Sequence, residues 1–182
     1  MRVISGTARG VRLETIEGLG TRPTTDRVKE NIFNIINWDI HGERVLDIFA
    51  GSGALGIEAL SRGAEFCTFI EESPRAGKII KENLNNTKLI ELSEVIEKKV
   101  ENGLNHLKGQ YGVIIMDPPY NQGLIIPTLE EITSRKLLEE EGIIIVEHDN
   151  TDKLPDSIAG LERYKIKKYG RTCVSFFRRN EE

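Results

Sequence analysis

Between residues 44 and 147, short apolar and β-branched runs alternate with stretches whose apolar residues recur at helical spacing. Such alternation is typical of a mostly parallel sheet with helices on both faces, because each parallel connection has to cross back over the sheet. The sequence therefore predicts a doubly wound, Rossmann-like α/β fold. The expected strands are 44–49, 65–71, 94–100, 112–117 and 142–147, and the expected helices are 54–62, 73–86, 101–108 and 123–138.

The C-terminal part of the chain departs from this alternation. Two further strand-like runs, 161–168 and 172–178, are separated only by Tyr169-Gly170-Arg171, with no helix between them. A connection this short joins antiparallel strands. We therefore expect a C-terminal antiparallel hairpin at one edge of the sheet.

The N-terminal part is expected to form a small extension. Residues 1–15 alternate around a turn-like stretch and predict a short hairpin, and Thr25 or Asp26 can cap the helix that follows. A two-stranded hairpin is marginal alone and has to pack against something. We therefore divide the 182-residue chain into an extension, 1–40, and a main domain, 41–182.

Charge is distributed unevenly along a chain whose net charge is −4. Residues 1–30 contain six Lys/Arg and four Asp/Glu, and residues 160–182 contain seven and three, so both ends are basic. A basic patch on an acidic body can still contact phosphates. We expect the extension to hold RNA; the alternative is that its arginines only cover and solubilise the sheet edge. The arginines concerned are Arg2, Arg9, Arg12, Arg22 and Arg27.

The remaining composition indicates a cytoplasmic protein. No apolar run approaches the length of a membrane span, and the N-terminus lacks the apolar core of a signal peptide. Cys67 and Cys173 lie in strand-like runs without the spacing of a metal site, so we interpret them as buried thiols. No metal is expected, and nothing in the sequence requires more than a monomer.

The first expected strand leads into a glycine-rich loop. It ends in Asp47-Ile48-Phe49-Ala50 and continues as Gly51-Ser52-Gly53-Ala54-Leu55-Gly56, a GxGxxG pattern that opens a helix. Such glycines let the backbone approach a ligand at the carboxyl ends of the strands. Glu71 ends the second strand, where a carboxylate can accept both hydroxyl groups of a ribose. A nicotinamide dinucleotide and S-adenosylmethionine both fit this pattern.

A second motif, Asp117-Pro118-Pro119-Tyr120, ends the fourth expected strand. The Asp117 side chain and the Pro118 carbonyl can accept hydrogen bonds from a planar amine, and the Tyr120 ring offers a stacking surface. These groups suit the exocyclic amine of a nucleobase, although the motif alone is equally compatible with a tight turn and a core tyrosine. We predict Asp117, Pro118 and Tyr120 as the catalytic residues.

The two motifs together favour S-adenosylmethionine. A carboxylate at Asp47 would repel a pyrophosphate but suits the ammonium group of a methionine moiety. The tips of the first and fourth strands should be neighbours at the switch point of the sheet, which brings donor and amine together. The sequence thus predicts a methyltransferase, with another nucleotide-binding enzyme as the alternative. The expected donor-binding residues are Asp47, Phe49, Ala50, Gly51, Ser52, Gly53, Leu55, Gly56 and Glu71.

Nearly the whole chain resembles the bacterial 16S rRNA guanine-N(2) methyltransferase family, within the class I methyltransferases. The resemblance rests on segments 2–6, 22–28, 46–63, 117–120, 146–148 and 169–172, of which Arg22-Pro23-Thr24-Thr25-Asp26-Arg27 is the most specific. It implies methylation of one guanine 2-amino group in small-subunit rRNA, as free RNA or in the assembling particle. One departure is Lys99, where class I enzymes usually have an acidic residue that meets the adenine; Glu101 and Asn102 are the alternative candidates for this contact.

The residues alone leave other functions open. An adenine-N(6) DNA or RNA methyltransferase would use the same corner, but the chain has no room for a large target-recognition region. A glutamine-modifying protein methyltransferase typically has Asn where this chain has Asp117. A non-catalytic ribosome-assembly factor would be expected to have damaged motifs, whereas Asp47, Glu71 and Asp117 are present.

Overall fold

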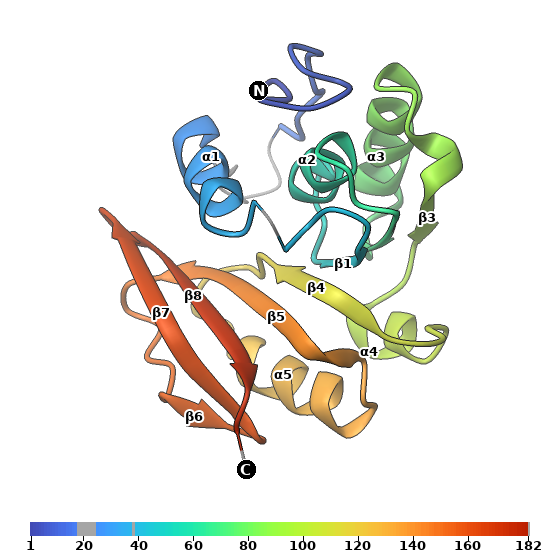
Figure 1. Ribbon diagram of the computed structural model, residues 1–182. Coiled ribbons are helices and arrows are strands. Elements are labelled where there is room, and N and C mark those ends of the chain that lie inside the picture. The colour runs from blue at the N-terminus through green and yellow to red at the C-terminus, as the bar shows by residue number, and fades with distance from the viewer. Residues whose placement is uncertain (18–24, 38, 182) are drawn as a thin grey trace.

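The computed structural model describes residues 1–17, 25–37 and 39–181, which contain one eight-stranded sheet (Figure 1). Its strand order is β3-β2-β1-β4-β5-β8-β7-β6. The strands β3, β2, β1, β4 and β5 pair in parallel, and β5, β8, β7 and β6 pair antiparallel. The strands are β1 (Arg44–Ile48), β2 (Phe66–Ile70), β3 (Ser93–Ile96), β4 (Tyr111–Met116), β5 (Leu138–Asp149), β6 (Ser157–Ile158), β7 (Leu161–Tyr169) and β8 (Thr172–Arg179).

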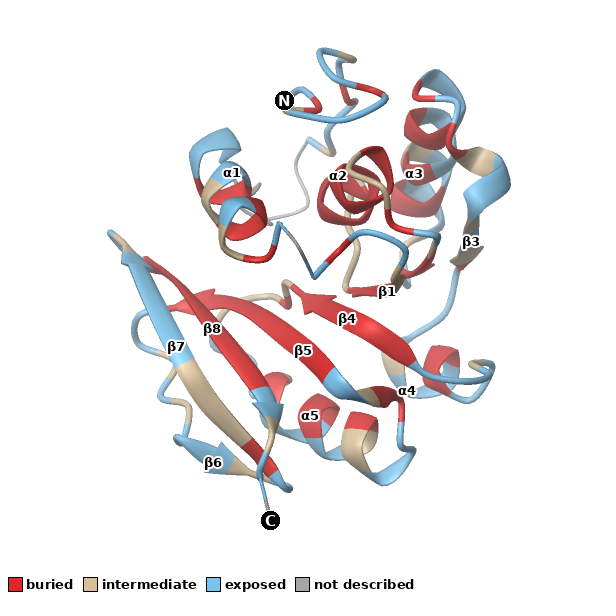
Figure 2. Ribbon diagram, viewed as in Figure 1, coloured by how far each residue is buried: buried red, intermediate tan, exposed pale blue. Residues whose placement is uncertain are grey.

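Helices cover both faces of this sheet, as the alternating pattern predicts. The helices are α1 (Asp26–Ile35), α2 (Ala54–Ser61), α3 (Pro74–Asn86), η1 (Ile90–Leu92), α4 (Val100–Leu104) and α5 (Ile125–Ser134). The first three α-helices pack on one face, in a core with Val45, Ile115 and Phe176, and the last two pack on the other. The central strands are buried on both sides, as Figure 2 shows.

The strands and helices predicted for the main domain are all present, several of them with different limits, and β6 is an additional strand. Strand β3 ends at Ile96 rather than at residue 100. Strand β5 begins at Leu138 because α5 ends at Ser134, followed by Lys136 at a φ of +55°, which a right-handed helix cannot contain. Strand β6 was not predicted, since two residues are too few to show alternation. Within the described ranges, no helix is both long and apolar enough to cross a membrane.

The predicted N-terminal hairpin is present in a short form, in which the N–H groups of Gly10 and Leu13 donate to the carbonyls of Val3 and Met1 at 2.8 and 2.9 Å. It has one isolated antiparallel bridge, between Arg2 and Arg12, with the N–H of Val3 bonded to the carbonyl of Val11 at 2.9 Å. The predicted cap of α1 is confirmed, since Thr25 Oγ1 accepts a hydrogen bond from the N–H of Val28 at 3.2 Å. The strand pairing in this segment is therefore too short to hold it in place by itself.

Buried polar side chains from α1 and α2 hold the N-terminal segment instead. The Glu58 carboxylate accepts the N–H of Ile4 at 3.0 and 3.1 Å and forms an ion pair with Arg62 at 3.3 Å. The ammonium of Lys29, which is fully buried, donates to the carbonyl of Arg2 at 2.7 Å. Ser61 Oγ accepts from Ala8 N–H at 2.9 Å and donates to the carbonyl of Ser5 at 2.7 Å.

Apolar side chains of the same segment join the main core. Val3, Ala8 and Leu13 are buried among residues of α1, α2 and α3. Gly6, at a φ of +90°, approaches α2 so closely that a Cβ would lie 1.8 Å from the carbonyl oxygen of Ser61. The described part of residues 1–40 therefore shares one core with the main domain.

We expect the substitution Glu58→Ala to destabilise the protein by about 2–4 kcal/mol, because it leaves the half-buried Ile4 N–H and Arg62 without their acceptor. Urea unfolding measures this loss. Glu82→Ala removes an exposed glutamate from α3 and should change the free energy of unfolding by less than about 0.5 kcal/mol. Equal stability of the two variants would show that the Glu58 contacts do not hold the extension.

Candidate active site

The two sequence motifs meet at the carboxyl ends of β1 and β4. These strands are parallel neighbours, with Ile48 paired to Met116, and the N–H of Asp117 donates to the carbonyl of Ile48 at 3.4 Å. Asp117, the first residue of the second motif, therefore lies next to the point where β1 ends and the glycine-rich loop begins. The predicted adjacency of the two strand tips is confirmed.

The backbone of the glycine-rich loop adopts left-handed conformations that favour glycine. Gly51 and Gly53 have φ values of +59° and +81°, and Phe49 has a φ of +60°. A Cβ on Gly56 would lie 2.4 Å from the ring of Phe69, so this glycine allows α2 to pack closely on β2. A Cβ on Gly51 would meet nothing within 4 Å. The loop therefore turns a bare stretch of backbone toward open space.

Glu71 holds this loop in place. Its carboxylate accepts the N–H of Gly51 at 2.8 Å and the N–H of Ser73 at 3.1 Å. A carboxylate offers about four acceptor positions, so two bonds leave capacity for a hydroxyl group. A half-buried carboxylate beside an open glycine backbone fits the ribose end of S-adenosylmethionine.

Asp47 lies beneath the loop. Its side chain is 1% exposed, and Oδ2 accepts the N–H of Gly56, in the first turn of α2, at 3.0 Å. Burial raises the pKa of Asp47 to about 8, the bond from Gly56 opposes this rise, and the charge of Glu71 adds to it. In this structure Asp47 positions the start of α2 under the loop.

The other predicted donor-binding residues follow the same path along the loop. Phe49, Ala50, Gly51 and Ser52 are half-buried, whereas Gly53, Leu55 and Gly56 are buried. Asn83 of α3, which the sequence analysis did not single out, donates to the carbonyl of Ser52 at 2.9 Å and to that of Glu14 at 3.0 Å. Asn83 therefore connects the loop to the N-terminal segment.

The residues after β3 lie on the β2 side of the glycine-rich loop, away from β4. Glu97 is the first residue beyond the strand and forms an ion pair with Lys81 at 2.8 Å. Lys99 precedes α4 as its N-cap residue, and Glu101 lies in the first turn of that helix. Both side chains are exposed.

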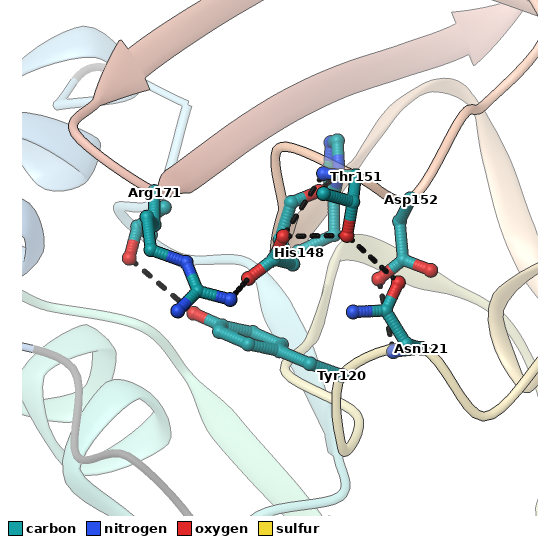
Figure 3. A network of polar contacts seen from close by, with 8 residues as sticks. Tyr120, Asn121, His148, Thr151, Asp152 and Arg171 are labelled. Carbon is teal, nitrogen blue, oxygen red and sulfur yellow. Dashed lines mark hydrogen bonds and ion pairs between the residues drawn. The ribbon is translucent and has the colours of Figure 1, made fainter.

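A polar network holds the Asp117-Tyr120 corner from behind (Figure 3). Asp149 Oδ1 accepts the N–H and the hydroxyl of Thr151 at 2.9 and 2.7 Å, and Oδ2 pairs with Arg171 at 3.2 Å. These bonds, above all those from Thr151, lower the pKa of Asp149. The Thr151 hydroxyl oxygen also lies 3.0 Å from the side-chain amide of Asn121, the residue directly after Tyr120. The network therefore joins the loops that follow β4, β5 and β7.

The aromatic residue of the corner is held by the same loops. Tyr120 is half-buried, and its hydroxyl lies 3.4 Å from that of Thr172, the first residue of β8. Asp117 is half-buried as well, and Pro118 is buried. His148 is buried, bonded to Ser175 Oγ at 2.8 Å, and its pKa is lowered chiefly by burial. The corner is therefore a fixed platform rather than a flexible loop.

A cavity of about 560 Å³ lies beside this platform, between the start of α1 and the β7–β8 turn. Thr172, which contacts Tyr120, also lines the cavity. The other lining residues are Thr25, Arg27, Val28, Glu147, Lys168, Tyr169 and Gly170. Its size lies within the range of pockets that enclose a small ligand.

The predicted RNA-binding arginines fall into two groups. Arg2, Arg9 and Arg12 are exposed on the N-terminal segment, and Arg27 lines the cavity. Arg22 lies outside the described residues. No cluster of metal-ligating side chains occurs in the described parts of the chain.

Glu147, Asp149 and Arg171 were not predicted as site residues. A signal was available, because three consecutive polar residues, 147–149, follow the apolar run 143–146. Polar residues at the carboxyl end of a buried parallel strand point to a site. Arg171 lies in one of the segments that carry the family resemblance, but nothing in the sequence indicates that it pairs with Asp149.

Known proteins resemble this chain over nearly all of its length. The model of the family described as "Conserved hypothetical protein 95" matches residues 1–178. YlbH of Bacillus subtilis is 41% identical, over 98% of this chain and 99% of that protein. "Ribosomal RNA small subunit methyltransferase D" of Escherichia coli K12 is 32% identical, over 100% and 91%. The solved structure of yhhF from Escherichia coli is 30% identical with a TM-score of 0.89, over 100% and 99%.

The raised pKa of Asp47 predicts a pH dependence that Asp47→Asn should remove. The folded protein holds a proton here between the ordinary pKa of 3.8 and about 8, whereas the unfolded chain has lost it. The contribution of Asp47 to stability therefore falls as pH rises through this window and is constant above it. Asn keeps an acceptor for Gly56 N–H without a charge.

We therefore expect the stability of Asp47→Asn, relative to the native protein, to increase between pH 5 and pH 8. Urea unfolding across this range measures the difference, in which contributions of the other titrating groups cancel. A difference that is constant with pH would mean that Asp47 titrates at its ordinary value.

Proposed function

Since the chain belongs to the family of bacterial 16S rRNA methyltransferases of the small-subunit methyltransferase D type, we propose that it methylates the exocyclic 2-amino group of one guanine in small-subunit rRNA. At the level of the family, the chain is an rRNA methyltransferase. The base, the atom and the individual residues are our proposal. We further propose that the enzyme acts in the cytoplasm, as a monomer, on the rRNA or the assembling subunit.

The observation that supports this proposal most directly is the contact between the two motifs. The Ile48 carbonyl, at the start of the glycine-rich loop, accepts the N–H of Asp117, at the start of the amine-binding corner. A ligand on the loop and an amine at the corner would therefore lie next to each other. Holding two reactants in this way is a large source of rate enhancement.

The donor fits the loop through Glu71 and the open backbone at Gly51. S-adenosylmethionine supplies a methyl group already activated by a sulfonium, so the protein has mainly to align the amine with it. Phe49, Ala50, Ser52, Gly53 and Leu55 shape the loop that would hold the donor, while Asp47 and Gly56 fix its position from below.

The acceptor amine needs to be turned toward the methyl group, because its lone pair is delocalised into the guanine ring. The Asp117 carboxylate and the Pro118 carbonyl accept hydrogen bonds from the two amino hydrogens, and Tyr120 stacks on the base. With the donor bound, a C–N bond would form as the C–S bond breaks, and the proton lost by the amine would pass to solvent water. Asp117 stabilises the positive charge that develops on the nitrogen.

A base that is paired or stacked has to leave its partners to reach this corner, at a cost of a few kcal/mol. Stacking on an aromatic ring recovers roughly 1–3 kcal/mol. Phosphate contacts would supply the rest. We assign these contacts to Arg2, Arg9, Arg12 and Arg27, together with Arg22, which lies outside the described residues.

We expect Asp117→Ala to lower kcat/KM by about 100-fold or more, because it removes an acceptor that holds the amine. The assay transfers labelled methyl groups to unmethylated small subunits and identifies the modified nucleoside by mass spectrometry. The wild type should yield N(2)-methylguanosine, and donor affinity should be the same in both proteins. Asp156→Ala, which removes an exposed carboxylate near β6, serves as the control.

Labelled methyladenosine would overturn the proposed base while keeping the mechanism of the corner. Equal rates of the Asp117→Ala and Asp156→Ala variants would overturn the role of Asp117.

The arginines of the N-terminal segment predict a salt-dependent interaction with RNA. Replacing Arg2, Arg9 and Arg12 by Gln should weaken RNA binding and reduce its dependence on salt, because fewer counterions are released. Filter binding at several salt concentrations measures both. A triple Gln variant at Lys108, Arg135 and Lys136, exposed residues near the amino ends of β4 and β5, is the matched control. Unchanged RNA binding in the first variant would refute the assignment.

A further inference from the structure

Glu147 occupies a distinctive position in the cavity beside Tyr120. It belongs to β5, is 3% exposed, and is the one carboxylate among the described residues that line the cavity. The lining residues around it come from α1 and from the turn between β7 and β8. The Glu147 carboxylate therefore lies in the wall of the cavity, where it can contact a ligand bound between α1 and the β7–β8 turn.

The strand register places Glu147 next to Asp117. Met116 pairs with Val146 in the parallel β4–β5 ladder, and both side chains point into the core beneath α4 and α5. Asp117 directly follows β4, and its N–H still bonds to the Ile48 carbonyl of β1, so the alternation of side chains continues for this residue. Continued by one residue, the alternation turns both Asp117 and Glu147 to the opposite face, toward α1. Neighbouring strands are about 4.8 Å apart. Asp117 and Glu147 thus bring two carboxylates to one face, side by side.

Two adjacent acceptors match one edge of guanine. On that edge the 2-amino group lies beside the N1–H, so both are donors, whereas adenine has an unprotonated N1 that accepts. An ionised carboxylate can only accept. A carboxylate beside the amine-binding corner therefore pairs with guanine and repels adenine.

We propose that Glu147 is the residue that selects guanine, by accepting the N1–H of the base whose 2-amino group Asp117 holds. This inference rests on the proposed function and names the group that determines its base specificity. Glu147 lies within the β5–β8 ladder, paired with Val174, so its backbone is fixed by strands rather than by a loop. It accepts a hydrogen bond and takes no part in bond making or breaking.

The remainder of the cavity suits the rest of a nucleotide. Arg27 on the α1 side and Lys168 on the β7 side are exposed cations at its walls. Cations of this kind contact phosphates and position a nucleotide without distinguishing its base. Base selectivity is thus assigned to Glu147 and phosphate contact to Arg27 and Lys168, so each role can be tested by its own variant.

The test compares two bases at the methylated position, once that position has been located by mapping the product. Small-subunit RNA is prepared by ligation with either guanosine or 2,6-diaminopurine riboside there, and is assembled into particles. Diaminopurine keeps the 2-amino group but has an acceptor at N1. We measure kcat/KM for methyl transfer to each, with the wild type, Glu147→Gln and Lys168→Ala.

The wild type should prefer guanosine by about tenfold or more, since one well-placed hydrogen-bond pair discriminates by that order. Glu147→Gln should reduce this ratio at least about tenfold, because the Gln amide can donate to the N1 of diaminopurine. Lys168→Ala should raise KM for both substrates equally and leave the ratio unchanged.

Several outcomes would overturn the inference. A wild type that methylates diaminopurine as well as guanosine refutes it without any variant, so the test does not depend on the folding of Glu147→Gln. An unchanged ratio in that variant refutes it as well. If the wild type produced no N(2)-methylguanosine, the proposed function itself would fail. This outcome differs from a failure of the Glu147 inference, in which N(2)-methylguanosine is still formed.

Discussion

The pairing of β1 with β4 is the interaction on which the site depends. It sets Ile48 beside Met116 and so places the glycine-rich loop and the Asp117-Tyr120 corner at the same point of the sheet edge. Since β1 and β4 are far apart in sequence, this contact exists only because the chain reverses its direction of winding there. Burial of both strands between two layers of helices makes the adjacency rigid.

Polar groups inside the protein extend this rigidity to the segments around the site. Glu58 and Lys29 hold the N-terminal segment, and Asn83 connects that segment to the carbonyl of Ser52 in the loop. On the other side, Asp149 joins Thr151 and Arg171 behind the platform of Tyr120. Buried hydrogen-bonded groups are costly to leave without partners, so each of these connections resists local opening.

Much of the fold could be predicted because its signals are local. The alternation of strand and helix patterns, the Thr25 cap and the turn at Gly170 each depend on neighbouring residues. Predictions failed where the outcome was not local. Strand β6 is too short for a pattern, and the side chains that hold the N-terminal hairpin, Glu58, Ser61 and Lys29, are distant from it in sequence.

The sequence by itself determined the class of fold, the two motifs and the family, since residue order and spacing are enough for all three. The tertiary structure decided how the side chains are used. It buried Asp47 under the loop it was expected to line, and it placed Glu147 of β5 in the wall of the cavity beside Tyr120. The physical reason is that burial and the register between strands arise only when distant segments pack, and neither is encoded in any short stretch of the chain.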